Sequence, residues 1–228
     1  MRDKESKYRA IIPPNLGWLE CKLSDKEMDY VWRCIGNKKQ DVARGGTYDL
    51  KDTGDWFWTN TILPTLLEYE NQFGGKINND IPTTCSHPLV LDRWWVNYQK
   101  QNQFNPDHNH SGLYSFVIWM KIPYDSKKVG LMHRFSDISV AISPVVNPVA
   151  HCGNFQFKYT DTLGDSRPFT YALDESYEGT MVFFPAKLRH QVYPFYDCDE
   201  DRISVSGNIT MNTSKITRSI FKDGLYSS

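Results

Sequence analysis

Apolar residues recur at helical spacing in one stretch of the N-terminal third, LSDKEMDYVWRCIGN. From Met28 to Ile35 they return every three or four positions, which is the period of one face of an α-helix. Ser24 followed by Glu27 three positions later is the pattern of a capping box at a helix start. Gly36 is a typical residue for a helix end. The sequence therefore predicts a helix that begins after Ser24 and ends at Gly36.

A second helix is predicted over residues 56–73, a stretch rich in aromatic and aliphatic side chains that Gly74 and Gly75 follow. Pro64 lies inside this stretch. Because proline has no backbone N–H and its ring clashes with the preceding turn, we expect a kink or a new helix start there. Both predicted helices lie before Pro82, so the N-terminal part of the chain is expected to be helical.

After Pro82 the pattern becomes that of β-strands. Segments either alternate between apolar and polar residues or are short apolar runs bounded by Gly, Pro, Asn and Asp, and both kinds indicate strands. The predicted strands are residues 89–99, 113–122, 154–160, 179–186 and 202–211. Several short strands separated by turn residues are typical of an antiparallel sandwich or barrel.

These patterns predict one mostly β domain with N-terminal helices. Residues 1–82 are expected to form a helical support region, residues 83–212 the β core, and residues 213–228 a tail. A long insertion is expected around residues 124–179, because the stretch after Tyr124 is polar and then rich in Pro and Val. A chain of 228 residues fits one such domain.

Composition narrows the functions and the location. The chain has 26 basic and 27 acidic residues and a net charge of −1. Nucleic-acid-binding proteins usually have an excess of basic residues, so the composition does not indicate nucleic acid as a partner. The charged N-terminus has no signal-peptide pattern, and no stretch approaches the roughly 18–20 apolar residues of a membrane helix. The five cysteines are odd in number and well separated, which argues against a disulfide framework and against a cysteine-based zinc site. We therefore expect a cytoplasmic protein that binds neither nucleic acid nor membranes, and we find no signal for an oligomeric state.

Two of the six histidines, His108 and His110, lie two positions apart in PDHNHSG. In an extended segment, residues i and i+2 point to the same side, so both imidazoles would face one point. Neutral imidazole is a common metal ligand near pH 7. Because two ligands hold a metal weakly, we expect a third ligand from elsewhere in the chain.

His190 is the best candidate for this third ligand because of its setting. A short apolar strand ends at Phe184 and Pro185, and after a turn His190 opens the next strand at the rim of the sheet. Twelve residues later, Arg202 and Ser204 share one face of a strand whose other face is apolar. A guanidinium fork beside a hydroxyl is suited to binding a carboxylate. Each motif alone is weak, and it is their order along the chain that makes the combination specific.

This combination resembles the Fe(II)/2-oxoglutarate-dependent oxygenases, in particular a branch of bacteria and their viruses with the motifs H-x-H-x-G, K-x-P, FP-x-x-L-x-H-x-V and R-I-S followed by N-I. The chain has HNHSG, MKIP, FPAKLRHQV and RISVSGNI, and the resemblance covers about residues 89–211. It implies a double-stranded β-helix, a jelly roll of the cupin type, as the core. It also implies an enzyme that uses Fe(II), 2-oxoglutarate and O2 to hydroxylate a C–H bond, with release of succinate and CO2.

Carried over to this sequence, the resemblance implies a role for each matching residue. The metal ligands, which are also the catalytic residues, would be His108, His110 and His190. The cosubstrate would be bound by Arg202, Ser204 and Tyr98. Of these three, Arg202 and Ser204 would hold the distal carboxylate, and Tyr98 the inner one.

His110 departs from the family pattern, which has a carboxylate at this position. The site would consist of three neutral imidazoles instead of the 2-His-1-carboxylate face that is usual for non-haem iron. An Fe(II) centre would then carry one more unit of positive charge, so we expect weaker and more pH-sensitive iron binding and some tolerance for zinc or copper. Asp107 lies one residue outside the frame and would become a ligand only through a β-bulge.

Three other functions stay open at this level. A three-histidine cupin-type dioxygenase would need no 2-oxoglutarate, and a non-catalytic β-barrel binding or structural protein would need no metal. An HNH nuclease is suggested only by the letters of the motif, and the chain has no basic patch for nucleic acid. The substrate is not identified by the sequence. Aromatic residues near the predicted site would suit a peptide side chain or a small metabolite, and they are Trp94, Trp95, Tyr98, Tyr114 and Trp119.

Overall fold

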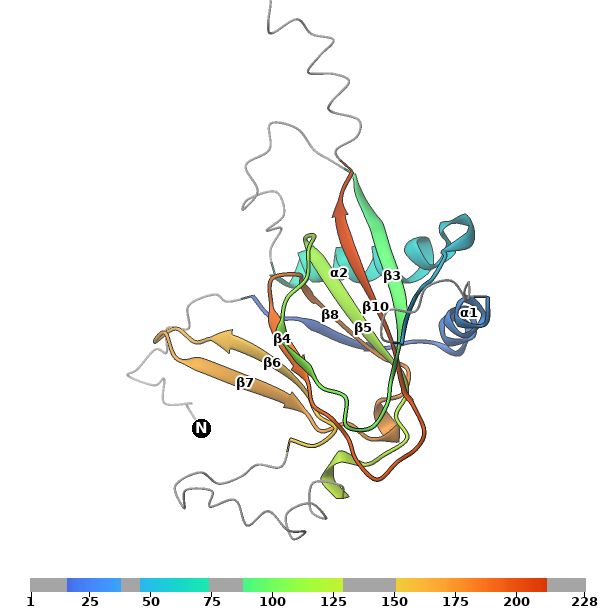
Figure 1. The fold of residues 1–228 in the computed structure, drawn as a ribbon. Coiled ribbons are helices and arrows are strands. Elements are labelled where there is room, and N and C mark those ends of the chain that lie inside the picture. Colours follow the sequence, from blue (N-terminus) through green and yellow to red (C-terminus); the bar gives the residue numbers. More distant parts are fainter. Residues whose placement is uncertain (1–15, 38–45, 74–87, 129–150, 213–228) are drawn as a thin grey trace, which may run out of the picture.

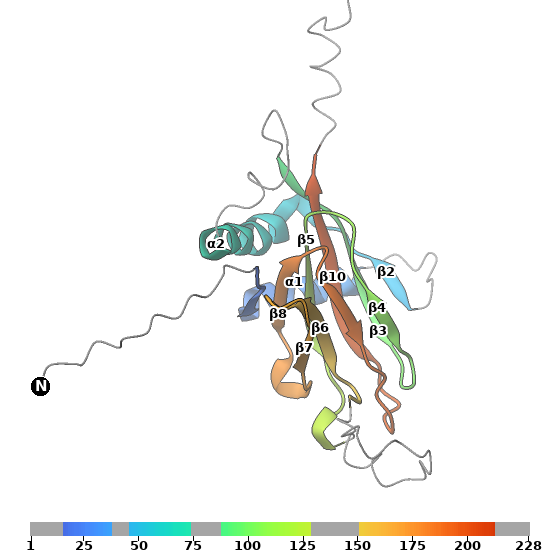
Figure 2. The same ribbon diagram turned by 90° about the vertical axis from the view of Figure 1, so that its left-hand side faces the viewer.

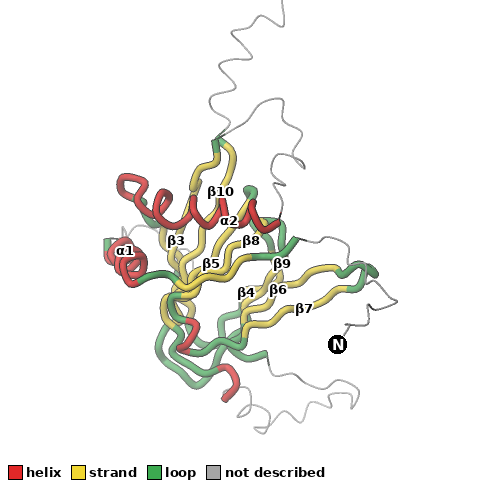
Figure 3. The backbone as a smooth tube through the Cα atoms, turned by 180° about the vertical axis from the view of Figure 1, so that it is seen from behind, coloured by secondary structure: helices red, strands yellow, loops and turns green. Residues whose placement is uncertain are grey.

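Two antiparallel β-sheets and a layer of helices make up the described part of the protein (Figure 1; Figure 3). The computed structural model describes residues 16–37, 46–73, 88–128 and 151–212. The larger sheet has the strand order β1-β8-β5-β10-β3-β2, and the smaller sheet has the order β4-β9-β6-β7. The strands are β1 (Leu19–Lys22), β2 (Thr47–Asp49), β3 (Leu89–Gln99), β4 (Asn105–His108), β5 (Tyr114–Lys121), β6 (Phe155–Thr160), β7 (Ser166–Tyr171), β8 (Thr180–Pro185), β9 (Arg189–Val192) and β10 (Arg202–Met211).

The eight strands from β3 to β10 form a jelly roll. Strands β3, β5, β8 and β10 lie in the larger sheet, and β4, β6, β7 and β9 lie in the smaller one. Eight antiparallel strands divided in this way between two facing sheets are a double-stranded β-helix. Figure 2 shows the long strands β3 and β10, which pair along almost their whole length. The predicted fold class is therefore confirmed.

Helix α1 (Asp25–Gly36) has the predicted start and end. The Glu27 carboxylate accepts hydrogen bonds from the backbone N–H and the hydroxyl of Ser24, at 2.8 and 2.6 Å. This satisfies a backbone donor that the first turn of a helix leaves without an intrahelical partner. Val31 and Ile35, which lie on the apolar face recognised in the sequence, are buried.

Helix α2 (Leu63–Phe73) follows a π-helical turn, Trp58–Ile62. Pro64 occupies the first turn of α2, where the missing N–H of proline costs no intrahelical hydrogen bond. The predicted second helix is therefore present, and Pro64 marks a new helix start after the π-helical turn.

Side-chain alternation along the strands divides the interior into two cores. The helix-side core lies between the helices and one face of the larger sheet, and its members include Val31, Leu66, Val96, Phe116 and Val205. The inter-sheet core lies between the two sheets, and its members include Val117, Trp119, Phe157, Val182 and Phe184. Because successive strand residues point to opposite faces, neighbours such as Phe116 and Val117 enter different cores.

The five strands predicted from alternation and apolar runs are present, as β3, β5, β6, β8 and β10, and the strand that His190 was expected to open is present as β9. The short strands β1 and β2 and the exposed strand β7 were not predicted. Strands β6 and β7 fall inside residues 124–179, where an insertion was expected, yet β6 pairs with β9 and is part of the core sheet. The rest of that stretch lies partly outside the described residues.

Two further findings bear on the composition of the chain. Among the described residues, no helix combines the length and the apolar character that a membrane crossing requires. The thiols of Cys21, Cys34, Cys152 and Cys198 are free. Cys85 lies outside the described residues.

Candidate metal centre

Three histidine side chains converge between the two sheets. His108 ends β4 and lies directly opposite His190 of β9, its partner in the strand pair. His110 follows two residues after His108, and the ligand nitrogens of all three lie within 4.8 Å of one another. Two of these nitrogens, Nε2 of His110 and Nε2 of His190, are 3.2 Å apart. The structure thus brings together the three residues that the sequence proposed as one cluster.

The backbone around the cluster fixes these rings in place. The N–H of His110 donates to the carbonyl of Ala186 at 2.8 Å, which ties the HxH segment to the turn before β9. The rings of His110 and His190 are nearly parallel, with centroids 5.0 Å apart. His190 is only 2 % exposed and stacks on Phe155 of the inter-sheet core. The cluster is therefore rigid on the His190 side.

The donor set suits a divalent metal ion. Nδ1 of His108 donates to the carbonyl of Pro106 at 2.7 Å, and Nδ1 of His190 donates to the carbonyl of Leu188 at 3.2 Å, because a carbonyl oxygen can only accept. These bonds leave Nε2 of both rings with a lone pair, the usual arrangement of a metal-binding histidine. Two nitrogens bound at a right angle to one ion roughly 2.1 Å away lie about 3 Å apart, close to the observed spacing of the two Nε2 atoms.

Burial keeps two of the imidazoles neutral. Burial and, to a smaller extent, the nearby His108 together lower the pKa of His110 to about 4 and that of His190 to about 3. A metal binds only the unprotonated ring, so His110 and His190 are ready to bind throughout the neutral range. The greater pH sensitivity of iron binding stays a prediction, and these low pKa values place the protonation of His110 and His190 below the neutral range.

These low pKa values predict that the metal-free protein is acid-labile. An unfolded histidine takes up a proton near pH 6.5, whereas His110 does so only near pH 4, so stability is lost as the pH falls through this interval. We expect the free energy of unfolding, measured with urea in the presence of a chelator, to fall between pH 6.5 and 4. The variant His110→Gln should show a shallower fall. If the free energy of unfolding fell equally steeply with pH in the wild type and in His110→Gln, His110 would not be the group responsible for the acid lability.

Gly112 allows the tight turn after the HxH segment. Its φ is +92°, and a Cβ there would lie 2.7 Å from the carbonyl oxygen of Ile209. Gly112→Ala is expected to cost at least about 2 kcal/mol, because it adds this contact to an unfavourable backbone conformation. Gly164 is a matched control, since its φ is +90° and no atom lies within 4 Å of its added Cβ. If urea unfolding gave the same loss for both alanine variants, the contact with Ile209 would carry no cost.

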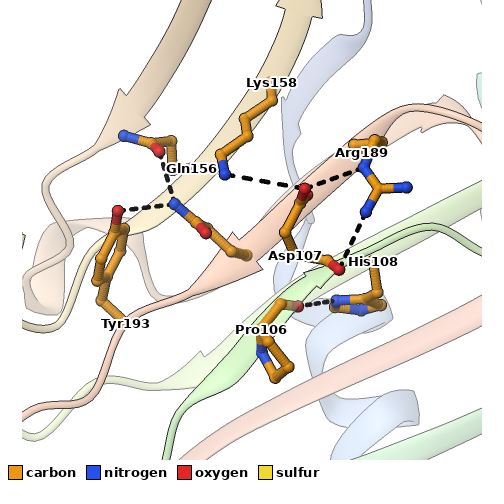
Figure 4. Close-up of polar contacts among 8 residues, drawn as sticks. Pro106, Asp107, His108, Gln156, Lys158, Arg189 and Tyr193 are labelled. Atoms are coloured by element: carbon orange, nitrogen blue, oxygen red, sulfur yellow. Dashed lines mark hydrogen bonds and ion pairs between the residues drawn. The ribbon is translucent and has the colours of Figure 1, made fainter.

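Asp107 does not belong to the histidine cluster. Its Oδ2 accepts a hydrogen bond from Nε of Arg189 at 3.0 Å and lies 3.8 Å from Nζ of Lys158 (Figure 4). The strand pair between β4 and β9 does contain an irregularity between Asn105 and His108, as the bulge alternative required. Even so, the Asp107 carboxylate is engaged by these cations, and among the described residues it is His110 that completes the cluster.

The histidines border a cleft whose lining also includes a buried arginine. The cleft has a volume of about 460 Å³, and its lining includes all three histidines and Arg202. Arg202 is 3 % exposed, and its Nη1 donates to the Tyr124 hydroxyl at 2.6 Å, while its Nη2 donates to the Gln99 amide oxygen. No carboxylate of the described residues is paired with it. A buried guanidinium held only by neutral groups provides a site for an anion.

Ser204 and Ser206 share the cleft-facing side of β10 with Arg202, as the alternation predicted. On the neighbouring strand β3, Asn97 faces the same cleft, and its Nδ2 donates to the Ser206 hydroxyl at 3.3 Å. Tyr98 borders the cleft, but its ring packs edge-on against Tyr48 and belongs to the helix-side core. The structure therefore does not bring the Tyr98 ring to the histidines.

Several cleft residues were not singled out from the sequence. Gln99 and Tyr124 hold Arg202, and Asn97 lines the cleft beside Ser206. Strand alternation contains a signal for two of them, because residues 95, 97 and 99 share one face of β3. Of the expected aromatic residues, Trp95 and Trp119 line the cleft. Trp94 and Tyr114 belong to the helix-side core.

Comparison with known proteins agrees with this geometry. The model of a 2OG-Fe(II) oxygenase family matches residues 93–208, just over half of the chain. No curated protein matches the sequence significantly.

Solved structures that resemble the chain include a prolyl-4-hydroxylase from Pseudomonas putida, with 14% identity over 86% of this chain and 94% of that one and a TM-score of 0.48. A prolyl hydroxylase from Trichoplax adhaerens, in complex with a hypoxia inducible factor peptide fragment, has 10% identity, coverages of 88% and 86% and a TM-score of 0.49. The family assignment rests on the family model, which covers more than half of the chain. The chain belongs to the 2OG-Fe(II) oxygenase family.

Proposed function

We propose that this oxygenase binds Fe(II) through His108, His110 and His190 and hydroxylates a C–H bond of its substrate. The fit of the three imidazoles to one ion and the family membership both support this assignment. In the overall reaction, substrate, 2-oxoglutarate and O2 give the hydroxylated product, succinate and CO2. When bound, Fe(II) supplies the site at which O2 is reduced and 2-oxoglutarate is oxidatively decarboxylated.

The observation that carries the proposal is that the buried Arg202 lines the same cleft as the three histidines. A dicarboxylate fits this arrangement, because its keto-acid end can reach the histidine side while its far carboxylate binds the guanidinium and the Ser204 hydroxyl. The Arg202 side chain is already oriented by Tyr124 and Gln99, so little conformational entropy is lost when the carboxylate binds. A cupin-type dioxygenase would need no 2-oxoglutarate, so dependence of the reaction on this cosubstrate distinguishes the two functions.

The remaining residues of the cleft position the reactants and exclude water. Val117, Trp119 and Phe155 form an apolar wall beside the path from the histidines to Arg202. A dry wall strengthens the ion pair between the cosubstrate and Arg202. The Nδ1–H bonds of His108 and His190 to backbone carbonyls keep their Nε2 atoms directed into the cleft.

The substrate is proposed to enter on the side of Trp95. This half-buried ring lies 5.8 Å from the ring of His110, and Thr47 and Asn97 line the cleft with it. The lining residues on this side are themselves uncharged, which suits an amino-acid residue of a peptide or a small metabolite. The Arg93 guanidinium lies 5.3 Å from the centroid of the Trp95 ring, so an anionic group on the substrate would also find a partner there. Hydroxylation of such a substrate is the reaction we assign.

A binding experiment with two keto acids tests the cosubstrate. The protein is reconstituted with Fe(II) without oxygen, and binding of 2-oxoglutarate is compared with that of 2-oxopentanoate, which has the same length but no distal carboxylate. We expect 2-oxoglutarate to bind at least about 30-fold more tightly, since truncating one partner of a buried charge pair costs about 2–5 kcal/mol. Oxygen should then produce succinate. Equal affinities would refute the Arg202 site, and oxygen uptake without succinate would favour the cupin-type reaction.

A further inference from the structure

A row of charged side chains lies on the outer face of the smaller sheet, directly behind the histidines. Lys158 of β6 pairs in register with Arg189 of β9, and both reach Asp107 of β4 (Figure 4). On the inner face, one residue further along, Phe157 pairs with His190, and His190 pairs with His108. Each residue of the outer row is therefore the chain neighbour of a residue of the inner row.

The pairing of β4 with β9 needs support beyond its backbone hydrogen bonds. Between Asn105 and His108, the pairing of β4 with β9 is irregular. An irregularity of this kind leaves backbone groups unpaired and weakens the definition of the register. Here Nη2 of Arg189 donates to the backbone carbonyl of Asp107 at 3.2 Å, while Nε donates to the Asp107 carboxylate at 3.0 Å. One guanidinium thus holds both the main chain and the side chain of the irregular residue.

We propose that Asp107, Arg189 and Lys158 form a positioning clamp that sets the spacing of His108 and His190. The inference rests on the proposed function, because it assigns the clamp to the metal site on the opposite face of the same strands. The clamp also explains why the Asp107 carboxylate is not a member of the histidine cluster. Two cations hold it on the outer face, and His110 is left to complete the cluster. Asp107 acts through His108 and is a positioning residue.

The partial burial of the clamp gives it energetic weight. The Asp107 side chain is 30% exposed, so its ion pairs are screened less than those of a fully exposed pair. Its Oδ1 is buried and has no hydrogen-bond partner among the described residues, so the charge depends on the contacts of Oδ2. Loss of either cation is therefore expected to release the carboxylate and loosen β4 against β9.

Cobalt binding to the full-length, metal-free protein tests the clamp, because Co(II) reports its coordination through its visible absorption. We expect Asp107→Asn and Arg189→Gln each to weaken Co(II) binding about 10- to 100-fold and to change the absorption bands, the range found for residues that orient metal ligands. The double variant should lose little more Co(II) affinity than either single variant, because both substitutions break the same interaction between Asp107 and Arg189. Asp107→Glu, which keeps the charge, should recover part of the affinity.

Asp161→Asn is the matched control. Asp161 also accepts from an arginine, Nε of Arg167 at 2.7 Å, but it lies in the turn between β6 and β7. This variant should leave Co(II) affinity and absorption unchanged, and the metal-free melting temperatures of the two aspartate variants should be similar. A purely structural role of Asp107 would lower its melting temperature and leave the cobalt spectrum unchanged, which would overturn the proposal.

Arg189→Gln separates the clamp from a direct role of Asp107 as ligand. If the carboxylate were a metal ligand restrained by Arg189, this variant would bind Co(II) more tightly, and the clamp would be wrong. Failure of the wild-type protein to bind any divalent metal would instead refute the proposed function. The two failures are therefore distinguishable.

Discussion

His190→Ala is expected to weaken metal binding by far more than about 100-fold and to abolish succinate formation. Orienting residues around a metal ligand are themselves worth 10–100-fold, so loss of a ligand exceeds that range. His190 is buried, has its Nδ1 bonded to Leu188, and presents Nε2 to His110 at 3.2 Å. The measurement is anaerobic titration with Fe(II) or Co(II), followed by detection of succinate after oxygen is admitted.

His151→Ala is the control for this substitution. His151 stacks on Tyr193, with ring centroids 4.8 Å apart, and does not line the cleft. Its alanine variant should bind metal and release succinate like the wild type. One equivalent of tightly bound metal in His190→Ala would place the centre elsewhere. The same titration of His110→Ala tests the third imidazole, and full affinity there would remove His110 from the ligand set.

Arg202→Gln is expected to raise the 2-oxoglutarate concentration needed for half-maximal succinate formation by about 100-fold. The substitution removes the cation from a buried anion site, a loss of about 2–5 kcal/mol for such pairs. Binding of 2-oxopentanoate, which has no distal carboxylate, should hardly change. This comparison assigns the effect to the carboxylate and not to a general distortion of the cleft.

Two further measurements complete the Arg202 experiment. Arg202 also donates to Tyr124 and Gln99, so the melting temperature of the variant must show that the fold persists. Arg167→Gln removes an exposed arginine that pairs with Asp161 and should leave the 2-oxoglutarate requirement unchanged. An unchanged requirement in Arg202→Gln would show that another group binds the distal carboxylate.

Local signals in the sequence were sufficient to predict those helices and strands whose residues show a capping motif or a regular alternation of apolar and polar positions. The capping box at Ser24 and the periodic apolar face predicted α1, and strand alternation predicted which face of β10 presents Arg202 and Ser204. The edge strands β1 and β2 were missed because strands of four and three residues are too short to show a period. Strand β7 was missed because it is exposed along most of its length and contains Pro168.

Site residues were predictable where the sequence matches a motif of the family. They were not predictable where packing against another residue of the fold sets the direction of the side chain. The ten-residue spacing between Tyr98 and His108 suggested a ligand contact, but the alternation of β3 directs the ring toward Tyr48. The partners of Arg202 come from β3 and from the segment after β5, and nothing in the sequence links these stretches. Such contacts depend on the folded chain.

The sequence by itself determined which chemical groups this protein offers: three imidazoles, an Arg-x-Ser pair of the kind suited to a carboxylate, and strands with one apolar face. These follow from residue type and period, which act locally. Only the tertiary structure decided that His110 and not Asp107 completes the cluster, because the cationic side chains that hold Asp107, Lys158 and Arg189, come from β6 and β9. It also decided that Arg202 is buried and lines the same cleft as the histidines, because burial depends on how the two sheets pack.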